Sequence, residues 1–508
     1  MKIMIIMRVV SSFSMCLLCL LFLYSCSHMY TNKTNKKDAE KSSEKNAKVN
    51  MNEIEEIMSS VSDANKMKEA KADANIEKVN LDIRKFVLKK NGLTILLAEN
   101  HHLPIVSYYT YFKVGSRYEG KGMSGATHFL EHLMFKGAKK YGPQQFDSIM
   151  EENGGRSNAY TSTDSTVYHQ AIPSAALETV LDLESDRMEN LLLEEKAFEK
   201  EKSVILEERK LRYDNSPTGK LFQKMTEIMY KGTPYGIPVI GYVDDIVNVQ
   251  RDDIKKYFNK FYAPNNAVLV IIGDIDIKKT LDLVNKYYGN IPSSKQVEKT
   301  KALLDNDDLY KFQGKSMPAE AENIKINANS NTPIFYIAYR GEKIGTKRYY
   351  VMDILASIFS AGASSYLVKK YVTGDTPTLN SISLYNYSFA KNGLYLIAGE
   401  LLNETKLEDF KNSWDKNQVN FCKEAISDHT VQKTKNQYMV AFFSALETNE
   451  GVAELVGNSE FYFNDHKYYK KELQELNSIT TKDVMDVCKE IFSGQKYGFF
   501  SVWEKHPK

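Results

Sequence analysis

The sequence is short of cysteine, and this shortage excludes one class of protein. Only five cysteines occur in 508 residues, and three of them, Cys16, Cys19 and Cys26, stand near the amino terminus. Cys422 and Cys488 remain for a folded region, and two cysteines so far apart cannot build a disulfide framework. They could pair in an oxidising compartment or stay as two thiols in the core.

The chain also lacks an excess of either charge. Lys and Arg number 67 against 65 Asp and Glu, which gives a net charge of +2. Nucleic-acid-binding proteins usually combine a basic patch with a reading motif, and neither is visible in this sequence. We therefore expect no nucleic-acid partner. The composition, 43% hydrophobic and 26% charged, is ordinary for a globular protein.

One uncharged stretch opens the chain. Lys2 and Arg8 precede VVSSFSMCLLCLLFLYSC, which has the pattern of a secretory signal and occupies residues 1–26 together with its basic start. Cys26 follows Leu-Tyr-Ser and resembles a bacterial lipobox, although Tyr24 is unusual at its position. The alternative is an uncleaved membrane anchor, since about 18 apolar residues are near the lower limit for spanning a bilayer. Either reading predicts an exported, membrane-attached chain.

The lipobox predicts where the protein is held. The mature chain would begin at Cys26 with a lipid on its sulfur, in the bacterial cell envelope and facing the periplasm. Ser27 stands where an aspartate would retain a lipoprotein in the inner membrane, so we expect the outer membrane. Residues 27–80 are rich in Lys, Asn, Glu and Ser, cannot bury a core, and are expected to be a disordered tether.

The remaining length predicts two domains, residues 81–300 and 306–508, because one compact core rarely exceeds about 250–300 residues. In the first, strands are expected at 86–88, 93–97, 105–114 and about 265–276, with helices at 143–153 and 174–230. An Asn-Gly pair at 91–92 marks a hairpin turn between the first two strands.

The second domain repeats the order of the first. The stretch 332–343 mirrors the third strand, 348–362 is helical, and 479–492 resembles 249–262. The charged stretch 293–308 is the expected boundary. We expect two tandem α/β units of the α+β class (α/β layered), each a mixed, mostly antiparallel sheet packed with helices. The alternative is two unrelated α/β domains.

The stretch GATHFLEHLMFKG, residues 125–137, has the pattern of a metal site. His128 and His132 stand one helical turn apart, so both imidazoles can reach one ion, and Glu131 lies beside them. This H-x-x-E-H order is the inverzincin signature. A hydrolytic zinc ion usually takes three protein ligands and activates a water, whose proton a nearby carboxylate accepts.

A second helical stretch, FEKEKSVILEERKLRYD, offers the third ligand. Glu201, Val204, Ile205 and Glu208 fall on one face. We expect Glu208 to bind the metal and Glu201 to orient a histidine or the water. Glu207 points about 100° away and is a weaker candidate.

The alternative is a solvated surface helix. Five apolar residues surround the histidines and favour a buried helix, in which polar groups need partners: Phe129, Leu130, Leu133, Met134 and Phe135.

These residues resemble the pitrilysin family of zinc metallopeptidases, of the short bacterial or mitochondrial-processing-peptidase-like type. The resemblance is strong over residues 84–300, and Glu208 stands 76 residues after His132, at the family's spacing. It implies one Zn²⁺ per chain, held by His128, His132 and Glu208, with Glu131 as catalytic base.

The resemblance also implies a substrate and a site for it. The substrate is a peptide or unstructured polypeptide, paired along a strand by Asn158, Ala159, Tyr160 and Thr161. The expected activity is that of an exported, membrane-anchored zinc metalloendopeptidase. The alternative is a non-catalytic scaffold or assembly protein of the same fold.

The second domain departs from the family pattern. It has no metal site, and the family's substrate-binding arginine, second arginine and tyrosine are replaced by Tyr366, Val372 and either Leu379 or Asn380. We therefore expect a heterodimer with a metal-free homologous chain that supplies the Arg/Tyr pair. The alternative is a homodimer with altered binding residues.

Overall fold

The computed structural model describes residues 80–312, 318, 321–328, 330–402 and 406–502. From Leu81 onward these residues belong to one compact unit. The expected signal, lipobox cysteine and tether lie outside the described residues. Within the described part of the chain, no helix is both long and apolar enough to span a bilayer.

The first sheet has six strands in the order β1-β2-β6-β3-β5-β4. Its neighbours pair antiparallel except β2 and β6, which are parallel. Central β6 is buried along its whole length, whereas β4 is polar, as suits an edge strand. The strands are β1 (Arg84–Val87), β2 (Thr94–Glu99), β3 (Ile105–Phe112), β4 (Arg156–Thr161), β5 (Thr166–Pro173) and β6 (Ala267–Gly273).

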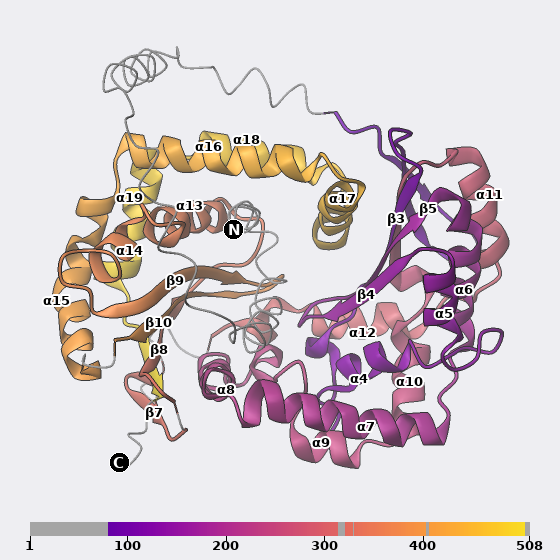
Figure 1. The fold of residues 1–508 in the computed structure, drawn as a ribbon, viewed down its shortest axis with the longest axis horizontal. Coiled ribbons are helices and arrows are strands. Elements are labelled where there is room, and N and C mark those ends of the chain that lie inside the picture. The colour runs from indigo at the N-terminus through magenta and orange to yellow at the C-terminus, as the bar shows by residue number, and fades with distance from the viewer. Residues whose placement is uncertain (1–79, 313–317, 319–320, 329, 403–405, 503–508) are drawn as a thin grey trace, which may run out of the picture. The chain divides into compact units, whose positions relative to one another are not determined.

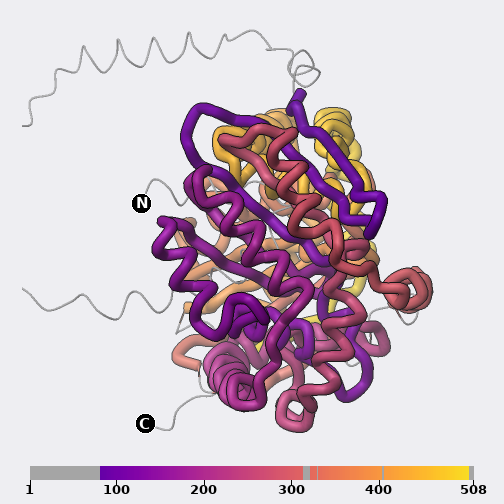
Figure 2. Tube along the Cα trace, turned by 90° about the vertical axis from the view of Figure 1, so that its right-hand side faces the viewer, coloured from indigo at the N-terminus to yellow at the C-terminus, as the bar shows by residue number. Residues whose placement is uncertain are grey.

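Helices of the first half cover one face of this sheet, and several are seen in front of the strands in Figure 2. Apart from α8, their apolar sides share one core with β2, β3 and β6. The helices are α4 (Ala126–Leu133), α5 (Gln145–Glu152), α6 (Leu177–Asn190), α7 (Glu195–Arg209), α8 (Pro217–Met229), α9 (Val243–Asn248), α10 (Arg251–Phe261), α11 (Ile277–Tyr288) and α12 (Gln296–Leu304).

The second sheet repeats the first with one strand fewer. Its order is β7-β11-β8-β10-β9, and again one pair, β7 with β11, is parallel. The strands are β7 (Ile324–Ile326), β8 (Ile334–Arg340), β9 (Leu379–Ser388), β10 (Gly393–Leu401) and β11 (Gly498–Val502). The expected fold class of two mixed, mostly antiparallel units is confirmed (Figure 1).

The helices of the second half follow the expected repeat. Helix α13 takes the place of α4, and α19 leads into β11 as α10 leads into β6. The helices are α13 (Lys347–Ser360), α14 (Tyr366–Tyr371), α15 (Leu407–Ala425), α16 (Asp428–Ala445), α17 (Asn449–Phe463), α18 (Tyr468–Ser478) and α19 (Thr481–Lys489).

Each half gives one helix to the other half's sheet. Helix α8 lays Leu221 and Met225 in a core with Tyr336 and Phe500 of the second sheet. Helix α17 packs on β3 and β6 of the first (Figure 1). A Cβ at Gly457 of α17 would lie 2.4 Å from the Tyr111 ring, so the close approach of this helix requires glycine.

Two expected stretches differ in detail from the structure. The helical stretch 174–230 is divided into α6, α7 with a π-helical turn at its end, and α8, with breaks at 191–194 and 215–216. The expected boundary, 293–308, contains α12, whose Val297 is buried. The domain limits 81–300 and 306–508 stay a prediction.

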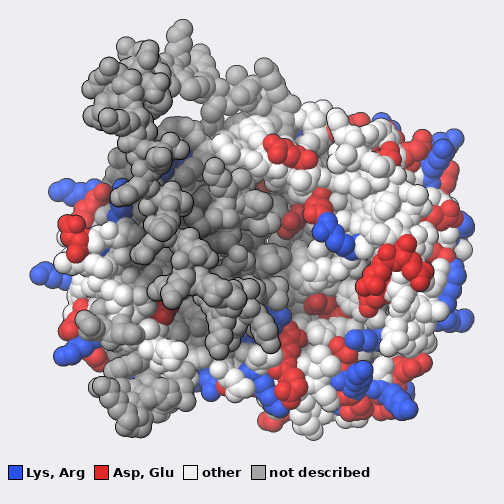
Figure 3. All heavy atoms as spheres, viewed as in Figure 1, with Lys and Arg blue, Asp and Glu red and all other residues white. Residues whose placement is uncertain are grey.

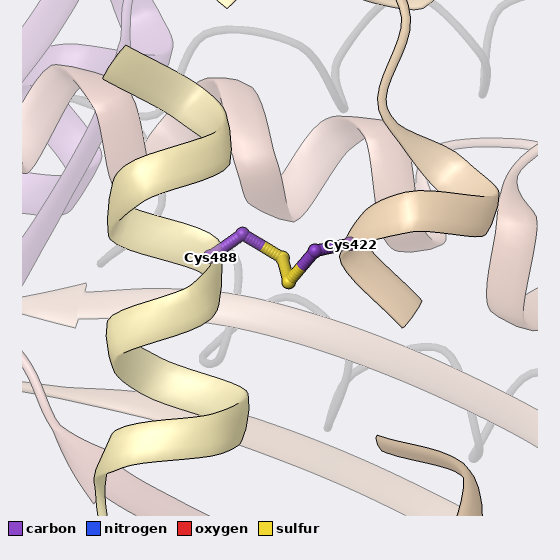
Figure 4. The surroundings of a disulfide bond; sticks show 2 residues. All are labelled: Cys422 and Cys488. Atoms are coloured by element: carbon purple, nitrogen blue, oxygen red, sulfur yellow. A yellow bond between two sulfur atoms is a disulfide. The ribbon is translucent and has the colours of Figure 1, made fainter. Parts of the chain in front are cut away.

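Cys422 of α15 and Cys488 of α19 form a disulfide, with 5.8 Å between their Cα atoms (Figure 4). Both residues are buried in the second core. Of the two alternatives left open by the sequence, the structure has the paired form. On the face drawn in Figure 3, acidic and basic side chains are interspersed among uncharged ones over the described surface.

Candidate metal centre

Helix α4 presents the two histidines and begins at a tightly packed point. Its N-cap, Gly125, has a φ of 86°, and a Cβ there would lie 2.5 Å from the carbonyl oxygen of Ile240. The Glu119 carboxylate accepts 2.8 Å hydrogen bonds from the N–H groups of Gly125 and Thr127. The carboxylate thus caps the positive end of the helix and fixes where its first turn starts.

The face of α4 opposite the two histidines is apolar and buried in the first core. This packing fixes the rotation of the helix, so His128 and His132 both point to the side of α4 away from the core. Phe129 stacks on Phe198 of α7, with 4.8 Å between ring centroids, and this contact sets α4 against α7. Ile205 of α7 is fully buried, but Val204 is 43% exposed. The expected face of α7 was therefore wrong at Val204.

Helix α7 brings Glu208 to both histidines. Its Oε2 lies 3.7 Å from His128 Nε2 and 3.4 Å from His132 Nε2. Among the described residues, these three form the group of ligand atoms able to hold one metal ion, all within 4.8 Å of one another. The structure thus brings together the three residues that the sequence named as ligands.

Two buried atoms of this group have no hydrogen-bond partner among the described residues. They are Glu208 Oε2 and His128 Nδ1. A buried carboxylate oxygen without a donor is costly, and Glu208 Oε2 faces two imidazole nitrogens. Two imidazoles and one carboxylate are a usual donor set for catalytic zinc, so the residues fit the expected ion.

The three residues of this group differ in how they hold protons. Burial lowers the pKa of His128 to about 4, so this imidazole is neutral and has a lone pair to offer. Burial also disfavours charge on His132, but the neighbouring carboxylates of Glu201 and Glu208 outweigh it and raise the pKa of His132 to about 9. At Glu208, the neighbouring His132, His128 and Arg212 outweigh burial and hold the pKa at about 2.

Glu201 contacts the His132 ring at Nδ1, the nitrogen that does not face Glu208. Its Oε1 lies 2.9 Å from His132 Nδ1, and its Oε2 pairs with Lys136 Nζ at 2.9 Å. The contact at Nδ1 fixes the tautomer that leaves Nε2 facing Glu208. By contrast, Glu207 is 69% exposed and pairs with Lys210, away from the histidines.

Glu131 lies beside the ligands, and burial raises the pKa of its carboxyl. Thr161 donates a hydrogen bond to its Oε2. Thr161 ends β4, the edge strand that holds Asn158, Ala159 and Tyr160, and β4 packs beside α4. The strand expected to pair with substrate therefore lies next to the candidate base.

Sequence reasoning missed Arg212. Its Nε lies 2.8 Å from Glu208 Oε1, so it engages the carboxylate oxygen that does not face the histidines. Arg212 lies in a π-helical turn, Lys210–Asp214, that continues α7. The spacing of four residues from Glu208 was a signal that could have found it.

The four second-half positions that replace the family's Arg/Tyr residues are engaged within their own half. Tyr366 donates a hydrogen bond to Glu424, and Val372 packs against the second core. Leu379 is buried, and Asn380 donates a hydrogen bond to the carbonyl oxygen of Leu401.

Comparison with known proteins relates both halves to one family. Residues 94–242 match the family model described as "Insulinase (Peptidase family M16)". Residues 248–438 match the model described as "Peptidase M16 inactive domain". The first of these ranges contains the candidate metal centre.

Similar sequences and structures cover most of the chain. A Helicobacter pylori protein named Zinc protease PqqE is 28% identical over 410 residues, 80% of this chain and 89% of that protein. The Mitochondrial-processing peptidase subunit beta of Lentinula edodes is 27% identical over 380 residues, 72% of this chain and 78% of that protein.

Two solved structures share the fold. The crystal structure of a protease from Helicobacter pylori aligns with a TM-score of 0.75 at 25% identity, over 84% of this chain and all of that chain. A peptidase M16 inactive domain from Pseudomonas fluorescens aligns with a TM-score of 0.72 at 15% identity, over 84% of this chain and 99% of that chain.

Proposed function

Since the chain belongs to the peptidase M16, or pitrilysin, family, we propose that it is a zinc metalloendopeptidase that cleaves peptides or unstructured polypeptides. One observation carries this proposal. His128, His132 and Glu208 offer three ligand atoms within 4.8 Å, and Glu131 lies beside them on the same helix as the histidines.

His128, His132 and Glu208 would hold the zinc ion, and Glu201 would keep the His132 ring in place. When bound, zinc lets a water ionise near neutral pH and polarises the carbonyl to be cleaved. Glu131 would take the proton of the attacking water and pass it to the departing amine nitrogen. Burial raises the pKa of Glu131, which makes it a better proton acceptor than an exposed glutamate.

Strand β4 would hold the substrate by adding a strand to the sheet. Strand β4 lies at the edge of the described sheet: it pairs with β5 on one side, and a substrate could pair with its other side. Backbone pairing along Asn158–Thr161 places the substrate next to Glu131 and is indifferent to substrate side chains. This arrangement favours extended substrates of many sequences.

The deciding experiment is the substitution Glu131→Gln. It removes the proton acceptor and leaves all three ligands, so we expect zinc to remain at one per chain while hydrolysis of an unstructured peptide falls at least 1,000-fold, on the order of other lost acid–base groups. The matched control is Glu207→Gln on exposed α7 surface, which should keep full activity. Retained hydrolysis in Glu131→Gln would refute the assigned role, and a wild type that binds no zinc would favour the scaffold alternative.

We further propose that the active form contains a metal-free homologous partner chain. Tyr366, Val372, Leu379 and Asn380 provide no arginine, and their side chains are engaged within the second half. The Lentinula edodes relative is named as a subunit, which supports a partner. Full hydrolytic rate in the purified chain, with no partner present, would instead favour the homodimer.

The location stays a proposal as well: a lipid-anchored protein of the bacterial cell envelope, held at Cys26. The disulfide between Cys422 and Cys488 supports an oxidising compartment such as the periplasm. Replacing Cys26 by serine should release the chain from the membrane fraction, and unchanged membrane attachment would argue for the uncleaved anchor.

A further inference from the structure

The Glu131 carboxylate is held by one side chain. Thr161 Oγ1 donates to Glu131 Oε2, and among the described residues no other group hydrogen-bonds to this carboxylate. A glutamate has three side-chain torsions, so a carboxylate at the margin of a site can point in several directions. A donor on Oε2 selects one of them and leaves Oε1 for a proton.

The geometry of β4 explains why Thr161 can reach Glu131. Side chains alternate along a strand, so Ala159 and Thr161 share one face of β4, and Tyr160 has the opposite face. Ala159 packs against the first core, on the side of α4. The Tyr160 ring instead approaches the His169 ring, at 6.4 Å between centroids. Thr161 is thus the last residue of the strand on the side of the candidate base.

The turn after Thr161 is unusually well fixed. The N–H groups of Ser116 and Arg117 donate to the carbonyl oxygens of Ser162 and Thr163. The Arg117 guanidinium also pairs with Asp164, with 2.8 Å between Nε and Oδ1, and both side chains are buried. A fixed turn keeps the end of β4, and with it the Thr161 hydroxyl, in one position.

The second half also contributes to this turn. The N–H of Ala390, beyond the end of β9, donates to Asp164 Oδ2 at 3.0 Å. Tyr235 donates to Asp164 Oδ1 at 3.0 Å and accepts from the N–H of Lys391. Hydrogen bonds therefore join the β9–β10 turn to Asp164, three residues after the residue that holds Glu131.

We propose that Thr161 is a positioning residue for proton transfer: its hydroxyl orients the Glu131 carboxylate, and Asp164 with the β9–β10 turn holds Thr161 in place. This role deepens, and rests on, the proposed peptidase function. It differs from backbone pairing of substrate along β4, because it belongs to the Thr161 side chain.

The test compares Thr161→Val with Thr161→Ser. Valine keeps the shape and the β-branch but removes the hydroxyl, whereas serine keeps the hydroxyl. With valine, we expect kcat to fall at least tenfold, while KM stays within twofold and zinc stays at one per chain. With serine, kcat should stay within threefold of wild type.

Thr163→Val is the matched control. Thr163 is two residues away and buried, and its Oγ1 has no hydrogen-bond partner among the described residues, so the same substitution should leave kcat unchanged. Crystal structures of the zinc-free wild-type and Thr161→Val proteins give a readout independent of turnover: the Glu131 side chain should change its torsions in the variant. If the valine variant does not fold, Thr161→Ala provides the same comparison.

Three results would overturn the proposal: full kcat in Thr161→Val, an equal loss in Thr161→Ser, or a loss confined to KM or zinc content. Glu131→Gln, assayed alongside, separates this failure from failure of the proposed function. An active wild type, an inactive Glu131→Gln and an unimpaired Thr161→Val would remove the role of Thr161 and keep the peptidase.

Discussion

At the scale of single residues, the site depends on carboxylates with different surroundings. Burial raises the pKa of Glu131, whereas hydrogen bonds from His132 and Lys136 outweigh burial and lower the pKa of Glu201. Glu201 therefore stays ionised beside His132. It is suited to holding an imidazole, and Glu131 is suited to taking a proton.

Substituting Glu201 by glutamine tests this division of roles. Glutamine keeps the size of the side chain but removes the charge beside His132 Nδ1, so we expect zinc affinity to fall about 10–100-fold, the usual effect of losing a partner of a metal-binding histidine. Competition with a zinc chelator measures this. Glu207→Gln, on the exposed side of α7, is the control, and an unchanged affinity in Glu201→Gln would contradict the role.

The candidate metal ligands could be named from the sequence because helical spacing fixes which side chains share a face. Thr161 and Arg212 could not be assigned so directly. The contact of Thr161 with Glu131 joins residues 30 apart, across a strand and a helix, and depends on how β4 docks on α4. Arg212 stands four residues after Glu208, but that spacing shows only that the two side chains can meet, and not that one of them is a metal-ligand candidate.

At the scale of elements, the start of a helix is stabilised by capping side chains, as at α19. Helix α19 begins with a capping box in which Thr480 and Asp483 exchange hydrogen bonds. Asp483 also pairs with Lys347 of α13 at 3.0 Å. These contacts outweigh the effect of burial and lower the pKa of Asp483 to about 2. Helix α19 carries the buried Cys488, so a stable first turn of this helix helps to hold the second core together.

The substitution Asp483→Asn should lower the free energy of unfolding by about 1 kcal/mol at pH 7. The folded-state pKa lies below the ordinary value of 3.8, so this contribution is present above pH 4 and is lost as the pH falls toward 2. Urea unfolding at several pH values measures it. Asp486→Asn, which removes an exposed pair with Lys482, should change stability by less than about 0.5 kcal/mol.

At the scale of the whole molecule, the two halves are less separate than their sequences predict. The repeated order of elements was visible because hydrophobic patterns are local. The exchange of α8 and α17 was not visible, because an apolar helix face shows that it is buried but not which sheet buries it. The uninterrupted apolar run of β6 indicated part of this arrangement. A strand that is buried on both faces needs a packing element on each side of its sheet.

The exchange predicts that neither half is stable alone. A fragment of residues 81–304 would expose the face of β3 and β6 that α17 covers and the face of α8 that the second sheet covers. We expect this fragment to bind a hydrophobic dye and unfold without a cooperative transition. Adding residues 305–508 should restore cooperativity, and a cooperative fragment 81–304 would contradict the prediction.

A point substitution tests the same interface in the full chain. Gly457→Leu would drive a side chain into the Tyr111 ring, which lies 2.4 Å from where a Cβ would stand. Overpacking of this kind typically costs about 1–3 kcal/mol, which thermal unfolding can measure. Gly120→Leu is the control, because a Cβ there meets no atom within 4 Å.

The free edge of β4 has a consequence for substrate choice under the proposed function. An open row of backbone groups attracts any extended chain, a second copy of this chain included, and the exposed, charged Arg156 at its start discourages such self-association. Under the proposed function, a chain whose backbone groups are already paired within its own fold would offer this edge little to bind. The edge would then select its substrates by how unfolded they are, and their side chains would matter little.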